Sequence, residues 1–480
     1  MKLVDYRNNS IAQEGMVKME TRVENDSIGS LEVPAQAYYG VQSLRAKENF
    51  HITGLRMNAY FIDGLAQIKK AAAVTNRDTG VLKESIANAI VRACDEILAG
   101  RLHDQFIVDP IQGGAGTSAN MNANEVIANR AIELLGGTKG DYSIVHPNDH
   151  VNMSQSTNDV FPTAGKLTVL SLLPNTIAQL NRLVDALSEK AVQFNNIVKM
   201  GRTQLQDAVP IRLGQSFHAY ASVVRRDIRR LEDVQKEMRS VNMGGTAIGT
   251  AINVHQDYLN SITGNLAKIS GKKLKQAEDL IDATQNLDGF TAVSGALKTC
   301  AVNLSKIAND FRLLSSGPKT GIAEINLPAK QNGSSIMPGK VNPVIPEVVS
   351  QVAFTVIGND LTITMAAEAG QLELNAFEPV LFYKLFESIT TLENGVRTFV
   401  DNCVKGITAN EKRCEELLHH SAGVATALCP YIGYKKSAEI AKEAMRTDTN
   451  VEEIVLEKGW LDKAELDTIL NPAAMTAPNE

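Results

Sequence analysis

The residues best suited to chemistry lie in one polar segment, GSSIMPGKVNP, at residues 333–343. Two hydroxyls, Ser334 and Ser335, follow a glycine, and Lys340 and Asn342 come two residues apart. The segment differs from a phosphate-binding loop because five residues, not four, separate its glycines. A valine also stands where a Ser or Thr would bind magnesium. It lies in a long non-helical stretch, so we expect a mobile loop that can close as a lid.

Three further polar clusters interrupt the apolar chain: GGAGTS at 113–118, SQSTND at 154–159 and GRTQLQD at 201–207. Residues 114–119 fit the dinucleotide fingerprint GxGxxA, but their surroundings predict helix rather than a βαβ unit. We interpret the first cluster as a glycine loop that presents backbone N–H groups and hydroxyls at a helix N-terminus, which suits a carboxylate. An ordinary turn with a helix cap is the alternative. For the second cluster a solvated loop is the default, with a helix beginning near Thr163 after it. For the third cluster a surface turn is the default.

Composition limits the class of protein. The chain has 480 residues, 44% of them hydrophobic and 21% charged, which is enough apolar material for a large core. Its net charge of −6 argues against a nucleic-acid-binding protein, because such proteins usually carry an excess of basic residues. Five cysteines without paired spacing argue against a disulfide framework or a zinc site. The charged N-terminus, and the lack of an apolar run approaching membrane-helix length, predict a cytoplasmic protein with no membrane partner.

Helical periodicity dominates the elements that must position these clusters. Apolar residues recur at spacings of three and four over 177–194, 217–238 and 293–314, whereas period-two alternation is scarce. The sequence therefore predicts a mainly all-α protein with long helices packed at shallow angles. The apolar stripes are narrow and flanked by small residues, which predicts a helical bundle shared between subunits. Shorter helices are expected on either side of this central region.

The segment at 333–343 resembles the signature loop of the aspartase/fumarase superfamily. The clusters GGAGTS, SQSTND and GRTQLQDAVP match the other regions of that family in the same order, and the resemblance runs from residues 37–41 through the C-terminal region. Within the superfamily the chain is most similar to the aspartase branch. The residues that carry this similarity are PVIPEV at 343–348, GND at 358–360 and AAEAGQL at 366–372.

The resemblance implies a three-domain, mostly helical fold in which the long helices of four subunits assemble into a twenty-helix bundle in a homotetramer. We expect an N-terminal domain at 1–157, a central five-helix domain at 158–412 that carries the signature loop, and a small C-terminal domain at 413–480. In this family each active site combines polar regions from three subunits. That arrangement would account for the distance between the clusters along the chain.

The implied activity is that of a carbon–nitrogen lyase, which reversibly deaminates L-aspartate to fumarate and ammonia through an aci-carboxylate intermediate. Ser334 matches the catalytic base of the family. The matched substrate-binding residues are Lys340, Asn342 and Thr203 for the α-carboxylate, Thr117, Ser156, Thr157 and Ser335 for the β-carboxylate, and Asn158 for the amino group. This chemistry requires no metal or cofactor, and the sequence shows no motif for either.

Gln204 departs from many relatives, because fumarases and some aspartases carry histidine at this position, with Glu347 matching its acidic partner. Without the histidine, a pair that could assist a water or hydroxide leaving group is missing, whereas ammonia needs less acid help. We therefore count Gln204 among the substrate-binding residues and favour aspartate over malate. The alternatives are a fumarate hydratase and a catalytically silent family member. The intact set of Ser334, Lys340 and Asn342 speaks against the silent member.

Overall fold

The structure, a computed structural model, describes residues 20–476 and is built mainly from α-helices. Strands among these residues occur as two-stranded pairs, so the prediction of a mainly α fold is confirmed. The described chain divides into two compact units. The first unit holds residues 20–167, 241–286 and 370–380, and the second holds 168–240, 287–369 and 381–476. The finer division into three domains at 157 and 412 stays a prediction.

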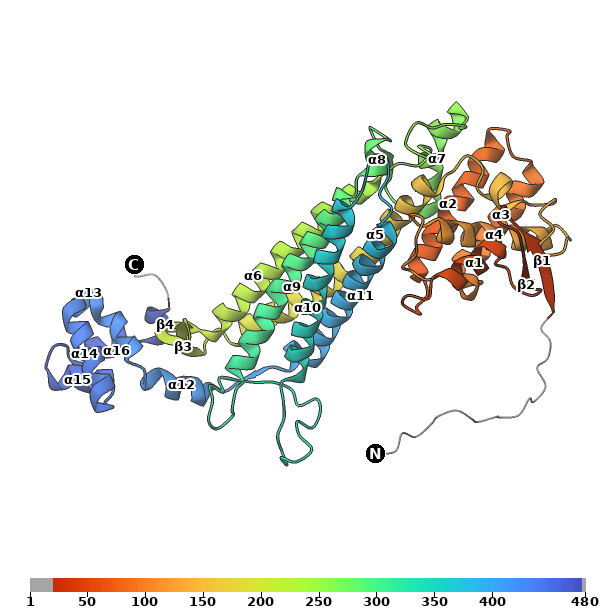
Figure 1. The fold of residues 1–480 in the computed structure, drawn as a ribbon. Helices are drawn as coiled ribbons and strands as arrows, with labels where there is room; N and C mark the ends of the chain where they lie inside the picture. The colour runs from red at the N-terminus through yellow and green to blue at the C-terminus, as the bar shows by residue number, and fades with distance from the viewer. Residues whose placement is uncertain (1–19, 477–480) are drawn as a thin grey trace, which may run out of the picture. The chain divides into compact units, whose positions relative to one another are not determined.

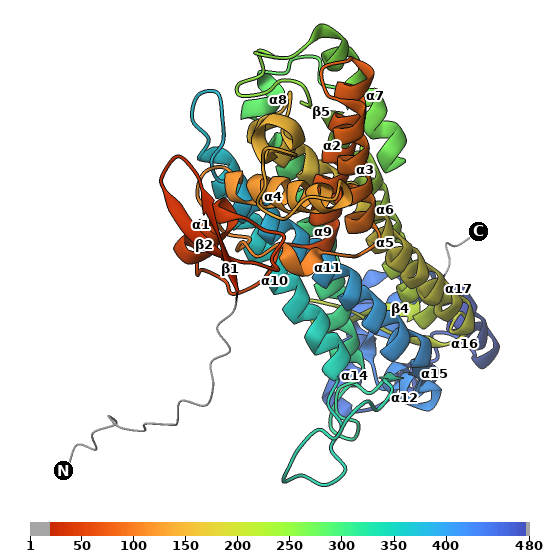
Figure 2. The same ribbon diagram turned by 90° about the vertical axis from the view of Figure 1, so that its right-hand side faces the viewer.

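Helices α2 and α3 pack side by side in the first unit (Figure 2). α2 spans Ala59–Asp78 and packs against α3, Glu84–Leu98, and α7, Gln256–Ser270, because its apolar residues recur every three or four positions. α4, Thr117–Leu134, packs against α3 and against α1, Val41–Asn49. Further elements of this unit are the hairpin β1–β2 (Thr21–Asn25 and Ser30–Pro34), β6 (Lys275–Gln276) and α8 (Asp282–Gln285). Strand β5 (Ser240–Val241) lies where the chain passes from one unit to the other.

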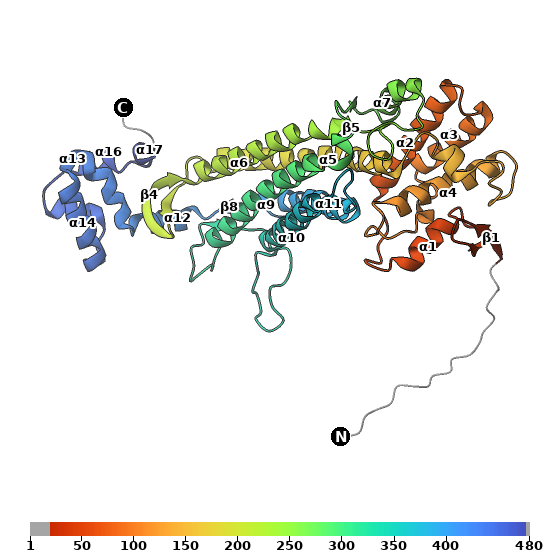
Figure 3. The ribbon, with the colours of Figure 1, turned by 45° about the horizontal axis from the view of Figure 1, so that its top comes forward.

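Long helices lie side by side in the second unit (Figures 1 and 3). They are α6, α9 and α10, at Leu213–Val234, Asp288–Leu314 and Val344–Glu368, together with most of α5, Thr157–Gln193, and α11, Glu378–Asn402. The helices expected from the three periodic stretches are thus confirmed. The helix expected to begin near Thr163 begins at Thr157, so that expectation was wrong by almost two turns.

Polar bonds and apolar contacts both join the bundle helices. The Tyr220 hydroxyl donates to Asp310 at 2.9 Å between α6 and α9. The Asn359 side chain donates to Ser388 Oγ at 3.1 Å between α10 and α11.

α10 is also long and apolar enough, by length and composition, to cross a membrane. This corrects the expectation that no apolar run approaches that length, although such a helix is equally typical of a protein interior or interface.

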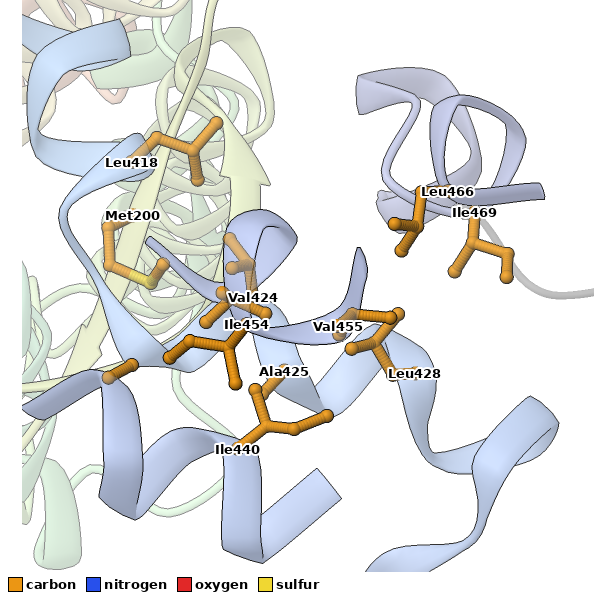
Figure 4. Close-up of a cluster of buried hydrophobic side chains, with 12 residues drawn as sticks. Met200, Leu418, Val424, Ala425, Leu428, Ile440, Ile454, Val455, Leu466 and Ile469 are labelled. Carbon is orange, nitrogen blue, oxygen red and sulfur yellow. The ribbon is translucent and has the colours of Figure 1, made fainter. Parts of the chain in front are cut away.

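The C-terminal part of the second unit packs around one apolar cluster (Figure 4). Met200, from strand β3 (Val198–Thr203), lies in this cluster beside residues of the short C-terminal helices. β3 pairs with β4 (Gln206–Arg212), so the cluster fixes the base of this hairpin. The short elements are β7 (Ile325–Asn326), β8 (Thr408–Ala409), α12 (Glu411–His419), α13 (Cys429–Ile432), α14 (Tyr434–Thr447), α15 (Val451–Glu457), α16 (Lys463–Ile469) and α17 (Pro472–Met475).

Candidate active-site segments

The segment at 333–343 forms a loop whose two ends are bonded to each other. It belongs to the long connection between α9 and α10, which extends from the end of the bundle in Figure 3. The Gly333 N–H donates to the Lys340 carbonyl at 2.7 Å, and the Asn342 side chain donates to the Gly333 carbonyl at 2.8 Å. These bonds close the neck of the loop, so that Ser334, Ser335, Lys340 and Asn342 are held in one short segment.

The Ser334 side chain accepts two backbone N–H groups of the same loop. Ile336 N–H donates to Ser334 Oγ at 3.2 Å, and Met337 N–H donates to it at 3.1 Å. Donors aimed at a serine oxygen stabilise negative charge on it, as a serine base requires. The loop thus directs two of its own backbone N–H groups at Ser334 Oγ. Ser334 is half-buried, whereas Lys340 is exposed and free to reach a ligand.

Thr203 and Gln204 lie at the tip of the β3–β4 hairpin. Thr203 pairs with Gln206, so that Gln204 and Leu205 form the two-residue turn. Both turn residues adopt left-handed backbone conformations, with φ of 55° and 63°. This geometry matches the twist of a two-residue hairpin but is unfavourable for side chains other than Gly, Asn or Asp. Both Thr203 and Gln204 are exposed, which leaves their polar groups available to a ligand.

In the first unit, residues 154–156 of the SQSTND cluster precede α5 and residues 157–159 form its first turn; none of the six is exposed, so the cluster is not a solvated loop. Asp159 is fully buried and accepts the N–H of Ser156 at 2.9 Å. Burial raises the pKa of Asp159 to about 6, although three backbone N–H groups and the Lys69 charge lower it. Asn120 donates to Thr157 Oγ1 at 3.0 Å, so Ser156 and Thr157 are each held by a buried partner.

Thr117 is the first residue of α4, as the glycine loop predicted. Gly116 precedes it with φ of 86°, and a Cβ there would lie 2.3 Å from the Phe161 ring, so the close approach requires glycine. Thr117 Oγ1 donates to the Gly114 carbonyl at 2.8 Å. Thr117 also lines a cavity of about 660 Å³ in the first unit, together with Arg45, Ser118, His146 and Asn148.

A buried ammonium group beneath the Ser156–Asn158 segment was missed in the sequence. Lys69 has no exposed surface and donates to Asn152 Oδ1 at 2.8 Å. Burial lowers the pKa of Lys69 to about 7, and the charge of Asp159 partly opposes that shift. The signal was a lysine on the apolar face of α2, where an uncharged residue is the ordinary choice.

The predicted ligands thus fall into two sets. One set, in the first unit, holds Thr117 and residues 156–158, and the other, in the second unit, holds Thr203, Gln204 and the loop at 333–343. Hydroxyl, amide and ammonium donors dominate both sets, which suits a substrate with two carboxylates. Over residues 20–476, no three His, Cys, Asp or Glu side chains are grouped so that they could hold a metal ion.

Comparisons with known proteins agree with these features. Residues 29–358 match a lyase family, and residues 424–477 match the fumarase C C-terminus family. The chain is 55% identical to the aspartate ammonia-lyase of Bacillus subtilis (strain 168) over 96% of its length and 97% of that protein. It is 49% identical to the aspartate ammonia-lyase of Escherichia coli (strain K12), over 95% of its length and 96% of that protein.

Solved structures show the same fold. The chain is similar to a fumarate lyase:delta crystallin from Brucella melitensis bound to cobalt, with a TM-score of 0.93, 52% identity and coverage of 96% of this chain and 100% of that one. It is also similar to a class II fumarase from Schistosoma mansoni, with a TM-score of 0.93 and 35% identity over the same shares of the two chains.

Proposed function

This chain belongs to the aspartate ammonia-lyases of the aspartase/fumarase superfamily, and we propose that it converts L-aspartate reversibly into fumarate and ammonia. It is thus a carbon–nitrogen lyase. One observation supports this chemistry above the others: the Ile336 and Met337 N–H groups both point at Ser334 Oγ. A serine oxygen that is to act as a base must carry negative charge, and these donors stabilise that charge.

In the proposed reaction, the Ser334 alkoxide takes the proton from Cβ of L-aspartate. The electron pair of the broken C–H bond moves into the adjacent β-carboxylate, which becomes a doubly charged aci-carboxylate. This pair then returns to form the C=C bond of fumarate while the C–N bond breaks and ammonia leaves. The extra negative charge develops on the β-carboxylate, so donors fixed around that group lower the barrier more than donors elsewhere.

The binding roles follow from the donors available. Thr117, Ser156, Thr157 and Ser335 would donate to the β-carboxylate, whereas Lys340, Asn342 and Thr203 would bind the α-carboxylate. Asn158 would contact the amino group: its side-chain N–H donates to the Ala247 carbonyl at 2.7 Å, which orients the amide oxygen as an acceptor for a substrate N–H.

We also propose a cytoplasmic homotetramer in which three subunits contribute to each active site. Support comes from α10, whose apolar side chains are exposed at Phe354, Leu361 and Met365. These residues recur at helical spacing, and a face of this kind is typical of a helix covered by a partner chain. The same interface would account for an apolar helix in a protein with no membrane partner.

Fumarate hydratase is the alternative, and it would use malate. The test is to follow fumarate absorbance after adding L-aspartate, or separately L-malate, to purified protein treated with chelator. We expect fumarate from aspartate alone. Fumarate from malate alone would overturn the proposal and show that Gln204 permits hydration. If neither substrate yields fumarate, the substrate is another amino- or oxygen-linked succinate, or the chain is a catalytically silent family member.

A further inference from the structure

Glu324 is a fully buried carboxylate that contacts two cations of strand β3. Arg202 Nη1 donates to Glu324 Oε1 at 2.8 Å, and Lys199 Nζ lies 3.0 Å from Oε2 as an ion pair. Lys199 also donates to the Met200 carbonyl at 2.7 Å. A buried carboxylate that is paired twice holds its partners firmly, because moving either cation away would leave charge uncompensated in a dry environment.

The backbone of Glu324 is fixed at the point where the long connection leaves α9. Its N–H donates to the Leu314 carbonyl at the end of α9 at 2.8 Å, and its carbonyl accepts from Asn410 N–H at 2.9 Å. The next two residues form β7, which pairs with β8. Glu324 therefore belongs to the rigid stem from which the loop at 333–343 extends.

Arg202 connects this stem to the tip of the hairpin. It directly precedes Thr203, and its guanidinium also donates to the Met200 carbonyl at 3.3 Å. The turn residues Gln204 and Leu205 are exposed and left-handed, so neither packing nor turn propensity fixes them. The position of the tip therefore depends on the bonds at its base, and Arg202 is the last charged anchor before Thr203.

We propose that Glu324 is a positioning residue that couples the hairpin tip at Thr203 and Gln204 to the stem of the signature loop. Through Arg202 it would hold Thr203, the proposed α-carboxylate ligand on the hairpin, in a fixed position relative to that stem. Glu324 itself touches no substrate. The inference rests on the proposed function for the identity of the ligand, but the coupling between hairpin and stem does not.

The test compares Glu324→Gln with the double variant Glu324→Gln/Lys199→Met. The single variant leaves the buried Lys199 and the half-buried Arg202 without a carboxylate and is expected to unfold more readily. The double variant removes one positive and one negative charge, so the original charge balance returns while the amide oxygen still accepts only weakly from Arg202. We expect the double variant to form the same oligomer as the wild type, with KM for L-aspartate raised about tenfold and kcat changed less, since ground-state binding is lost.

Asp227→Asn is the matched control. Asp227 is also a buried carboxylate of the second unit, paired with Arg230 at 2.7 Å, but it joins α6 to Asn303 of α9. This variant should lower the melting temperature without raising KM. An unchanged KM in the double variant, or an equal rise in Asp227→Asn, would overturn the proposal.

Amide hydrogen exchange tests the coupling without any turnover. We expect the exchange of residues 203–206 to rise in the double variant, while the exchange of α9 and α6 stays at the wild-type level. Unchanged exchange at the tip would remove Glu324 as a positioning residue even if the enzyme is active. If the wild-type protein makes no fumarate but the double variant still exchanges faster at the tip than the wild type, only the proposed function is overturned.

Discussion

The Asp159 carboxylate accepts the backbone N–H of Ser156, three residues earlier, at 2.9 Å and so closes the first turn of α5. Its other oxygen accepts the N–H groups of Gly244 and Thr246 at 3.0 and 3.1 Å. One buried carboxylate therefore both caps the helix and ties the Ser156–Asn158 segment to a distant part of the first unit. Ser156, one of the predicted β-carboxylate ligands, is therefore held directly by this group.

Replacing this carboxylate by an amide tests that dependence. Asp159→Asn keeps one acceptor oxygen but turns an NH₂ group toward N–H donors, so the start of α5 should loosen. We expect KM for L-aspartate to rise about tenfold and the melting temperature to fall. Asp141→Asn is the control, because Asp141 is an exposed residue that accepts locally from Ser143. Equal KM values in the two variants would contradict the role of Asp159.

The pH dependence of stability provides a second test of the same residue. Because burial raises the pKa of Asp159, the folded protein binds this proton more tightly than the unfolded chain does. The group therefore stabilises the fold below pH 3.8, and this contribution is lost as the pH rises to about 6. The shift from 3.8 to about 6 corresponds to about 3 kcal/mol.

The measurement is the free energy of unfolding of the wild type minus that of Asp159→Asn, determined between pH 4 and pH 7. The difference should decrease as the pH rises through this window and become constant above it. A difference that does not change with pH would show that Asp159 keeps an ordinary pKa in the folded protein.

The Ser334 hydroxyl is the expected base, so Ser334→Ala should lower kcat by at least about a thousandfold. The proposed tetramer and fumarate binding should persist, because Ser334 bonds only to the backbone of its own loop among the described residues. Exchange of the substrate Cβ proton with deuterated solvent gives an independent readout. Near-normal exchange in the alanine variant would remove Ser334 from proton abstraction.

The neck of the loop can be opened without touching any proposed ligand. A Cβ at Gly333 would lie 2.6 Å from the Lys340 carbonyl oxygen and 3.0 Å from Asn342 N, so Gly333→Ala must separate the two ends of the loop. We expect kcat/KM to fall about tenfold or more while the melting temperature barely changes, since the loop lies outside the bundle core. Gly264→Ala in α7, where a Cβ meets nothing within 4 Å, should leave kcat/KM unaltered.

The long helices could be predicted because burial of one face imposes a period on the sequence. The start of α5 could not, since Ser156 and its polar neighbours look solvated until Gly244 and Thr246, far along the chain, cover Asp159. A surface turn was expected in GRTQLQD, but its form as the tip of a two-residue hairpin was not. Gln204 and Leu205 lack the glycine or asparagine that marks left-handed turns, and only tertiary bonds at the base of the hairpin compensate for their strain.

Lys340 supplies the one full positive charge among the proposed substrate ligands, so its removal should weaken binding more than any single hydroxyl would. Lys340→Ala is expected to raise KM for L-aspartate by about 10- to 100-fold and to lower kcat as well, because a loosely held α-carboxylate leaves Cβ poorly placed against Ser334. Lys330→Ala is the control, since Lys330 is an exposed lysine of the same connection outside the loop. If both variants keep wild-type kinetics, long-range attraction by lysines is excluded too, and the α-carboxylate must be held by another cation. If both weaken binding equally, the connection attracts substrate by its charge alone, and Lys340 is no specific ligand.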